Sequence, residues 1–223
     1  MVFKEISAIL SSQSYGYKVN VLINGTDIGV TGEKSESKRL FDQDNHFSKK
    51  ADSAMKRLFC LKKDNNKVSV KFSKISGSEH DQLQLSLEMR EYPAPLFLVH
   101  SSSKSSGKIE FSFDLQEKCP SDFIPIFISD QEGKAVLVYV KNISGTITPS
   151  LNGVKGMAIA DMPGSVVLEN VKSGVNELSI NYSGEVGNEA NLVVVTPKEF
   201  KSLNLKITKE SAEQVEKIKF VVK

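Results

Sequence analysis

Residues 171–183, VKSGVNELSINYS, repeat the pattern of residues 61–73, LKKDNNKVSVKFS. Aligned without gaps, the two stretches match polar with polar residues and apolar with apolar residues. The polar matches are Lys62, Asn66, Ser69 and Ser73 with Lys172, Asn176, Ser179 and Ser183. The apolar matches are Leu61, Val68, Val70 and Phe72 with Val171, Leu178, Ile180 and Tyr182. We interpret the match as an internal duplication of one structural unit.

Each copy predicts a tight turn followed by a strand that has one buried face. We expect Asp64 or Gly174 to adopt the left-handed backbone conformation in the turn. The asparagine two positions later, Asn66 or Asn176, is expected to hydrogen-bond nearby backbone groups. A polar loop and a further apolar strand, LQLSL at 83–87 or NLVVV at 191–195, follow each copy.

Apolar and polar residues alternate along most of the chain, which is the period of a strand with one buried face. Turn-forming residues separate these stretches, as at Asn24-Gly25 and Asn152-Gly153. The pattern predicts an all-β protein of two tandem antiparallel β-sandwiches, of jelly-roll or immunoglobulin-like type. One or two short helices are expected besides, at residues 48–59 and 208–218.

The position of the two copies predicts a domain boundary between them. A chain of 223 residues suits two domains. We expect an N-terminal sandwich over residues 1–118 and a C-terminal sandwich over 119–223, joined by the polar segment QEKCPSD at 116–122. Of the two cysteines, Cys60 reads as a small core residue and Cys119 lies in this connector. A disulfide between them remains an open alternative.

The turn pattern apolar-Lys-x-Gly-x-Asn-x-apolar-x-apolar-x-aromatic resembles a strand pair of galactose-binding-like jelly-roll sandwiches. VKSGVNELSINY fits this pattern, whereas LKKDNNKVSVKF carries Asp64 at the glycine position. The earlier segment VLINGTDIGVTG is similar to the strand and turn that precede it in such domains. The resemblance implies the architecture and assigns no ligand-binding residue, because sugar-binding and purely structural domains share the motif. An immunoglobulin-like sandwich is the alternative.

Composition limits the partners and the compartment. The net charge is only +2, with lysines and acidic residues interleaved, so we expect no nucleic-acid partner. No apolar run reaches the length of a membrane span, so no membrane-spanning segment is expected. The N-terminal residues lack a signal-peptide pattern, which predicts a cytoplasmic protein. Removal of a leader would leave the same sequence, and secretion is the alternative.

No group of residues predicts catalysis. The three histidines, His46, His80 and His100, lie in polar loops or at a strand end, where surface positions are expected. Neither a nucleophile elbow nor a phosphate-binding glycine loop is present. We therefore expect a protein that is not an enzyme and needs no cofactor.

Two sets of residues are candidates for ligand binding. Asp42, Asp44 and His46 lie within the short stretch FDQDNHF and would suit a calcium or transition-metal ion. Tyr15, Tyr17 and Tyr92 are the aromatic candidates for stacking on a sugar, since the chain has no tryptophan. A polar loop and tyrosines at the edge of the core are the structural alternatives.

These observations favour a non-catalytic structural or protein-interaction module. Such a scaffold would present loops or an edge strand to a protein partner or to another copy of itself. The alternative is a module that binds carbohydrate or another small ligand, with calcium assistance through Asp42 and Asp44.

Overall fold

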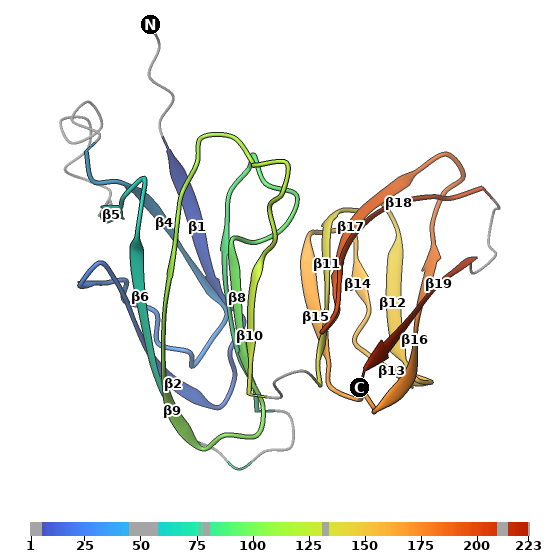
Figure 1. Ribbon diagram of the computed structural model, residues 1–223, viewed down its shortest axis with the longest axis horizontal. Helices are drawn as coiled ribbons and strands as arrows, with labels where there is room; N and C mark the ends of the chain where they lie inside the picture. Colours follow the sequence, from blue (N-terminus) through green and yellow to red (C-terminus); the bar gives the residue numbers. More distant parts are fainter. Residues whose placement is uncertain are drawn as a thin grey trace, which may run out of the picture. The chain divides into compact units, whose positions relative to one another are not determined.

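A computed structural model describes residues 6–44, 58–75, 77, 81–130, 134–208 and 214–222. The chain divides into two compact units, Met1–Asp130 and Gln131–Lys223 (Figure 1). Each unit has its own apolar core. The boundary lies beyond the predicted position at 118–119. A strand at 126–129 belongs to the first unit because it pairs within a sheet of that unit.

The first unit is a sandwich of two sheets. One has the order β10-β8-β7-β1-β4-β5 and the other has the order β3-β2-β6-β9. The strands are β1 (Ser7–Ser12), β2 (Tyr17–Ile23), β3 (Thr26–Asp27), β4 (Glu36–Asp42), β5 (Leu58–Leu61), β6 (Asn66–Lys74), β7 (Leu83–Glu88), β8 (Phe97–Ser101), β9 (Ser106–Phe113) and β10 (Ile126–Ser129).

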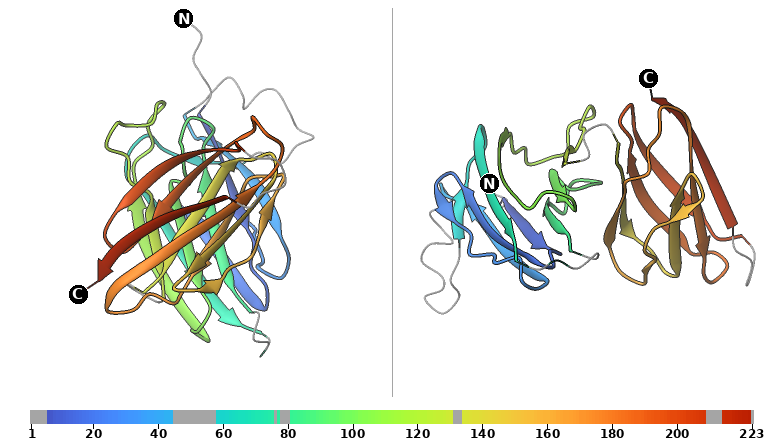
Figure 2. Two further views of the ribbon diagram at one scale, coloured as in Figure 1. Left: turned by 90° about the vertical axis from the view of Figure 1, so that its right-hand side faces the viewer. Right: turned by 90° about the horizontal axis from the view of Figure 1, so that it is seen from below.

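The second unit is also a sandwich of two sheets, of order β15-β11-β17-β18 and β13-β12-β16-β19, with β14 paired to β12. Figure 2 shows β19 running beside β16 in the second of these sheets. The strands are β11 (Val136–Asn142), β12 (Thr146–Leu151), β13 (Val154–Lys155), β14 (Ile159–Ala160), β15 (Gly164–Leu168), β16 (Gly174–Ser183), β17 (Glu189–Val195), β18 (Phe200–Lys206) and β19 (Gln214–Val222).

Both units have the same strand topology. The order β4-β1-β7-β8 of the first unit corresponds to β15-β11-β17-β18 of the second, and β3-β2-β6-β9 corresponds to β13-β12-β16-β19. Every one of these pairings is antiparallel in both units. The all-β prediction is confirmed. Two strands of the first unit, β5 and β10, have no counterpart among the described strands of the second.

The repeated sequence stretch forms the same hydrogen-bonded turn in each unit. In the first unit, the amide Nδ2 of Asn24 donates to Oδ1 of Asn66 (3.0 Å) and to the carbonyl of Cys60 (2.7 Å). The backbone N–H of Lys67 donates back to Asn24 Oδ1 (2.9 Å). Asn66 is buried, and it accepts from the N–H of Lys62 (2.8 Å) and donates to the carbonyl of the same residue (2.7 Å).

The second unit repeats these contacts atom for atom. Asn152 Nδ2 donates to Asn176 Oδ1 and to the carbonyl of Asn170, both at 2.8 Å, and the N–H of Glu177 donates to Asn152 Oδ1 (3.0 Å). Asn176 exchanges hydrogen bonds of 2.8 Å with the backbone N–H and carbonyl of Lys172. The predicted backbone bonds of the repeated asparagine are confirmed. The sequence did not predict that each repeated asparagine also bonds a second asparagine, Asn24 in the first unit and Asn152 in the second.

One detail of the predicted turn is wrong in the first unit. The left-handed residue is Asn65, with φ 52°, rather than Asp64, whereas Gly174 has φ 90° as predicted. Asparagine adopts this conformation more readily than most non-glycine residues, so the turn that lacks the glycine uses the next position.

The predicted short helices are not confirmed. Apart from Thr208, which lies in a loop, the described parts of both stretches are strands, because residues 58–59 lie in β5 and residues 214–218 lie in β19. The alternation of apolar and polar residues explains the strand at 214–218, since Ile218 and Phe220 are both buried in the second core while β19 pairs with β16. The rest of the two stretches, 48–57 and 209–213, lies outside the described residues.

Both cysteines are free thiols, so the Cys60–Cys119 disulfide is not formed. Cys60 is buried in the first core, as predicted, and burial raises the pKa of its thiol to about 12. A thiol that ionises only at such pH is not a nucleophile near neutrality.

Candidate functional site: an outer sheet edge in each unit

The aromatic candidates are dispersed, and two of the three are buried. Tyr17 is 0% exposed and its hydroxyl donates to the carbonyl of Lys104 (2.9 Å). Tyr92 is 3% exposed and packs edge-on against Phe123, with ring centroids 4.8 Å apart. Neither ring offers a face on which a sugar could stack. Tyr15 is 49% exposed and is the aromatic candidate whose ring reaches solvent.

The acidic candidates form a local turn. Asp42 ends β4, and its Oδ1 accepts a hydrogen bond from the backbone N–H of Asp44 (2.9 Å). His46 lies outside the described residues. Within the described ranges, no three His, Cys, Asp or Glu side chains are grouped so that they would hold a metal ion.

His100 departs from its expected surface position. It lies in β8 and is 4% exposed. His80 falls outside the described residues.

The strand β10 covers the outer edge of β8 in the first unit. It pairs parallel to β8, with Ile126 opposite Phe97 and Ile128 opposite Val99. The N–H of Ile126 donates to the carbonyl of Leu96 (3.0 Å). Both isoleucines pack against the first core. A sheet edge with unpaired backbone groups is thereby closed by an added strand.

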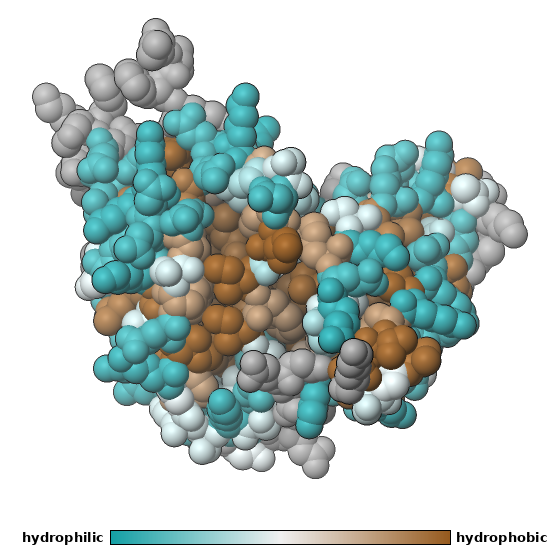
Figure 3. Space-filling model, in the orientation of Figure 1, coloured by the Kyte–Doolittle hydropathy of each residue, from teal (hydrophilic) through white to brown (hydrophobic). Residues whose placement is uncertain are grey.

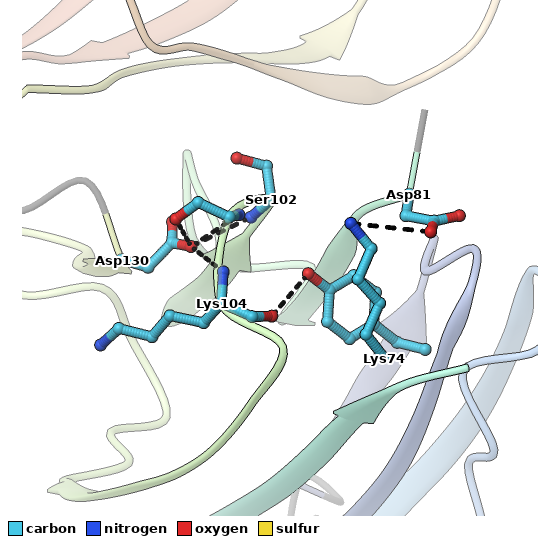
Figure 4. A network of polar contacts seen from close by, with 7 residues as sticks. Lys74, Asp81, Ser102, Lys104 and Asp130 are labelled. Atoms are coloured by element: carbon cyan, nitrogen blue, oxygen red, sulfur yellow. Dashed lines mark hydrogen bonds and ion pairs between the residues drawn. The ribbon is translucent and has the colours of Figure 1, made fainter. Parts of the chain in front are cut away.

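A carboxylate fixes the C-terminal end of β10. Asp130 follows β10, and its N–H donates to the carbonyl of His100 (3.2 Å). Its Oδ2 faces the loop after β8 (Figure 4). The donors to this single oxygen are the N–H groups of Ser102 (3.2 Å), Ser103 (2.9 Å) and Lys104 (3.1 Å) and the hydroxyls of Ser101 (2.8 Å) and Ser103 (2.7 Å). Successive N–H groups turned toward one anion form a strong anion-binding loop.

This loop connects to the core through Lys104 and Tyr17. The Tyr17 hydroxyl bonds the Lys104 carbonyl, and Lys74 Nζ lies 5.8 Å from the centre of the Tyr17 ring. Lys74 also forms an ion pair with Asp81, at 3.6 Å (Figure 4). The hydrogen bonds that hold Asp130 at the end of β10 are therefore part of a network that reaches β2 through Tyr17 and β6 through Lys74.

The charge of Asp130 should make the first unit less stable in acid. Burial alone would raise the pKa of Asp130, but the hydrogen bonds from Ser103, Ser101 and Lys104 outweigh it and lower the pKa from 3.8 to about 2. A lowered pKa contributes stability that is complete above about pH 4 and is lost as the pH falls through about 2.

We expect Asp130→Asn to lower the free energy of unfolding by about 1 to 2 kcal/mol at pH 7, a value reduced from the full shift because the carboxyl is partly exposed. Urea unfolding of both proteins between pH 7 and pH 2 measures this difference, which should shrink toward pH 2. A difference that is constant across this range would contradict the assigned role of the charge.

The equivalent edge in the second unit is formed by β18, which pairs only with β17 among the described strands. The N–H of Thr196 donates to the carbonyl of Glu199 (2.9 Å). Because hydrogen-bonded pairs alternate along an antiparallel ladder, residues 201, 203 and 205 bond to β17. The backbone groups of residues 200, 202 and 204 therefore point away from β17, toward the outer edge.

The ladder registers define which residues of β8 and β18 correspond. The pairs Phe97–Leu87 and Val99–Leu85 of the first unit match Lys201–Val194 and Leu203–Leu192 of the second. The Leu96 carbonyl, which accepts a hydrogen bond from β10, matches that of Phe200. At the position where the first unit has Phe97, opposite Ile126 of β10, the second unit has the exposed Lys201.

The edge of β18 is basic and partly apolar. It carries Lys201 and Lys206 and no acidic residue. Leu203 is half-buried and packs against the second core. An added strand that met this edge would need a negative charge opposite Lys201 and an aliphatic side chain opposite Leu203.

A separate hollow of about 410 Å³ lies on the outer face of the sheet β2-β6-β9. Its lining includes the outward-facing side chains of Leu22, Lys67, Ser69, Glu110 and Ser112. The hollow offers charged and hydroxyl groups to a small polar ligand.

Comparison of the chain with protein-family models, with curated proteins and with solved structures finds no match. The described residues contain no helix with the length and hydropathy of a membrane span.

Proposed function

We propose that this chain is a non-catalytic interaction module that binds an extended segment of a protein partner along the outer edge of β18. The observation that carries the proposal is the difference between the two units at one position. In the first unit this edge holds the parallel strand β10, and in the second unit no described strand occupies it. Strand addition to a sheet edge is a common mode of peptide recognition.

The chemistry of the edge specifies the partner segment. The pairing of β10 with β8 indicates that the segment runs parallel to β18, with its N–H groups donating to the carbonyls of Phe200 and Asn204. An aspartate or glutamate would meet Lys201, and an isoleucine or valine two positions later would meet Leu203. Backbone hydrogen bonds would supply affinity, and these two side chains would supply specificity.

A peptide derived from the first unit tests this proposal. The probe is residues 124–130, IPIFISD, with Glu in place of Ile126, labelled with a fluorophore and titrated into the full chain. We expect saturable binding that Ser202→Pro weakens by about tenfold or more, because proline removes an edge-facing N–H and leaves the bonds to β17. Ser202→Ala is the matched control and should bind like the unmodified chain.

Charge reversal provides the second arm of the experiment. Lys201→Glu should weaken binding of the glutamate peptide and favour the peptide that has Lys in place of Ile126. The proposal is refuted if the glutamate peptide does not bind, if binding survives Ser202→Pro, or if the preference does not reverse. Thermal unfolding of each variant verifies that the chain remains folded.

A second candidate function is carbohydrate binding in the outer hollow of the first unit. The polar side chains of that hollow favour it, and so does the resemblance of the repeated turn to galactose-binding-like sandwiches. A sugar that binds there would raise the melting temperature of the chain, and Glu110→Ala would remove this response. The same variant would leave the β18 peptide unaffected, so the two functions are distinguishable.

A further inference from the structure

The strand β9 forms the edge of the sheet β3-β2-β6-β9 in the first unit, and it is eight residues long. The N–H of Lys74 donates to the carbonyl of Ser105 (2.6 Å), which identifies Lys74 and Ser105 as a hydrogen-bonded pair. By alternation, residues 107, 109, 111 and 113 bond to β6. The backbone groups of Ser106, Lys108, Glu110 and Ser112 point away from β6.

We infer that β9 pairs antiparallel with β9 of a second copy of this chain, about a two-fold axis at Ile109. In that register the edge-facing backbone groups of Lys108 meet those of Glu110 of the second copy, and Ser106 meets Ser112. No described strand pairs with this side of β9, so the N–H and carbonyl groups of all four residues lie on the required side. The pairing joins the two β3-β2-β6-β9 sheets into one continuous sheet.

Charge complementarity favours a second copy of this chain as the partner of β9. Within one chain, Lys108 Nζ lies 2.7 Å from a carboxylate oxygen of Glu110, and both side chains are well exposed. The two-fold axis places each lysine opposite the glutamate of the other copy, so one residue pair supplies two cross-strand attractions. A single strand whose charges are self-complementary is suited to pair with itself.

The side chains on the core-facing side of β9 also favour a second copy of this chain as the partner. Ile109 and Phe111 face the first core but are only half-buried, and apolar side chains gather on this side of the unit (Figure 3). In the inferred register Ile109 meets its own copy. Phe111 of the second copy falls opposite Gly107, whose core-facing side is already covered by the ring of Phe72 from the neighbouring strand β6.

The corresponding strand of the second unit lacks this complementarity. A full-length antiparallel pairing of β19 with itself is centred on Ile218 and places Lys217 opposite Lys219 of the second copy. Like charges directly opposite each other are destabilising, and lysines on edge strands commonly prevent self-pairing. Opposite charges thus favour self-pairing of β9, whereas like charges disfavour self-pairing of the equivalent strand β19. We therefore expect the dimer to form through β9 alone.

Charge reversal on β9 tests the inference. We expect the full chain to show a concentration-dependent dimer in sedimentation velocity experiments. Lys108→Glu and Glu110→Lys should each raise the dimer dissociation constant by about tenfold or more, since each change makes both cross-strand contacts repulsive. The double variant Lys108→Glu/Glu110→Lys should restore dimerisation, because the reversed charges are again complementary. Lys118→Glu, the same charge change at an exposed position outside β9 and β19, is the matched control.

The inference is overturned by any of three results: a chain that stays monomeric, single variants that dimerise like the unmodified chain, or a folded double variant that does not recover. It does not rest on the proposed binding at β18, because Ser202→Pro should leave the dimer intact. Circular dichroism and thermal unfolding verify that each variant is folded.

Discussion

Replacing Asn176 by alanine should lower the free energy of unfolding of the second unit by about 3 kcal/mol. The side chain is 0% exposed and makes hydrogen bonds with both backbone groups of Lys172 and with Asn152. Alanine would leave these buried groups without partners, and each such group costs about 1 to 3 kcal/mol. Loosening of Asn152 would also weaken its bond from Glu177.

Asn66→Ala should have the corresponding effect on the first unit, because the contacts are equivalent. Urea unfolding combined with amide hydrogen exchange distinguishes the two units, since each variant should increase exchange only in the strands of its own unit. Asn204→Ala, at an exposed position on β18, is the control and should change stability by less than about 0.5 kcal/mol. A loss below 1 kcal/mol for both buried asparagines would show that the network is not a main source of stability.

A methyl group at Gly145 should be comparably damaging. Gly145 has φ 130°, and an added Cβ would overlap the carbonyl oxygen of Ser183 and lie 3.0 Å from the Cα of Gly184. The N–H and carbonyl of Gly145 are both bonded to Asp161, at 3.0 Å each, so the loop has little room to move away. We expect Gly145→Ala to cost about 3 kcal/mol or more, from backbone strain and the clash together.

Gly153→Ala separates these two causes. Gly153 also has a positive φ, of 84°, but a Cβ there would have no neighbour within 4 Å. Only backbone strain remains, so a cost of about 1 kcal/mol is expected. Thermal and urea unfolding of the two variants give the comparison. Equal losses at the two glycines would contradict the assignment of the larger part to the contact with Ser183.

The repeated stretch predicted the fold because alternation and turn chemistry are local. Val68 and Val70 face the core for the same reason as Leu178 and Ile180, and no distant residue is needed to see it. The helix predictions were wrong where alternation of apolar and polar residues competed with helix propensity. In residues 208–218 helix-forming residues are frequent, but the alternating apolar residues from Ile218 onward decided for a strand.

The candidate sites depend on pairings that sequence does not show. The segment IFIS at 126–129 reads as a short apolar run, and nothing in it indicates that it lies parallel to β8. The carboxylate of Asp130 and its donors in the loop after β8 are far apart in the chain. A signal was present in SSSK at 101–104, whose serines and successive N–H groups are typical of anion-binding loops, but its occupant is visible only in three dimensions.

The difference between Phe97 and Lys201 also bears on how the chain reaches its native state. Two adjacent units with one topology risk exchanging strands while they fold, a characteristic failure of proteins with repeated domains. If β10 were to attach to β18 in place of β8, Ile126 would lie against the ammonium group of Lys201 rather than the ring of Phe97. We expect this mismatch to disfavour the exchange, so that Lys201 would favour pairing of β10 with β8 of its own unit.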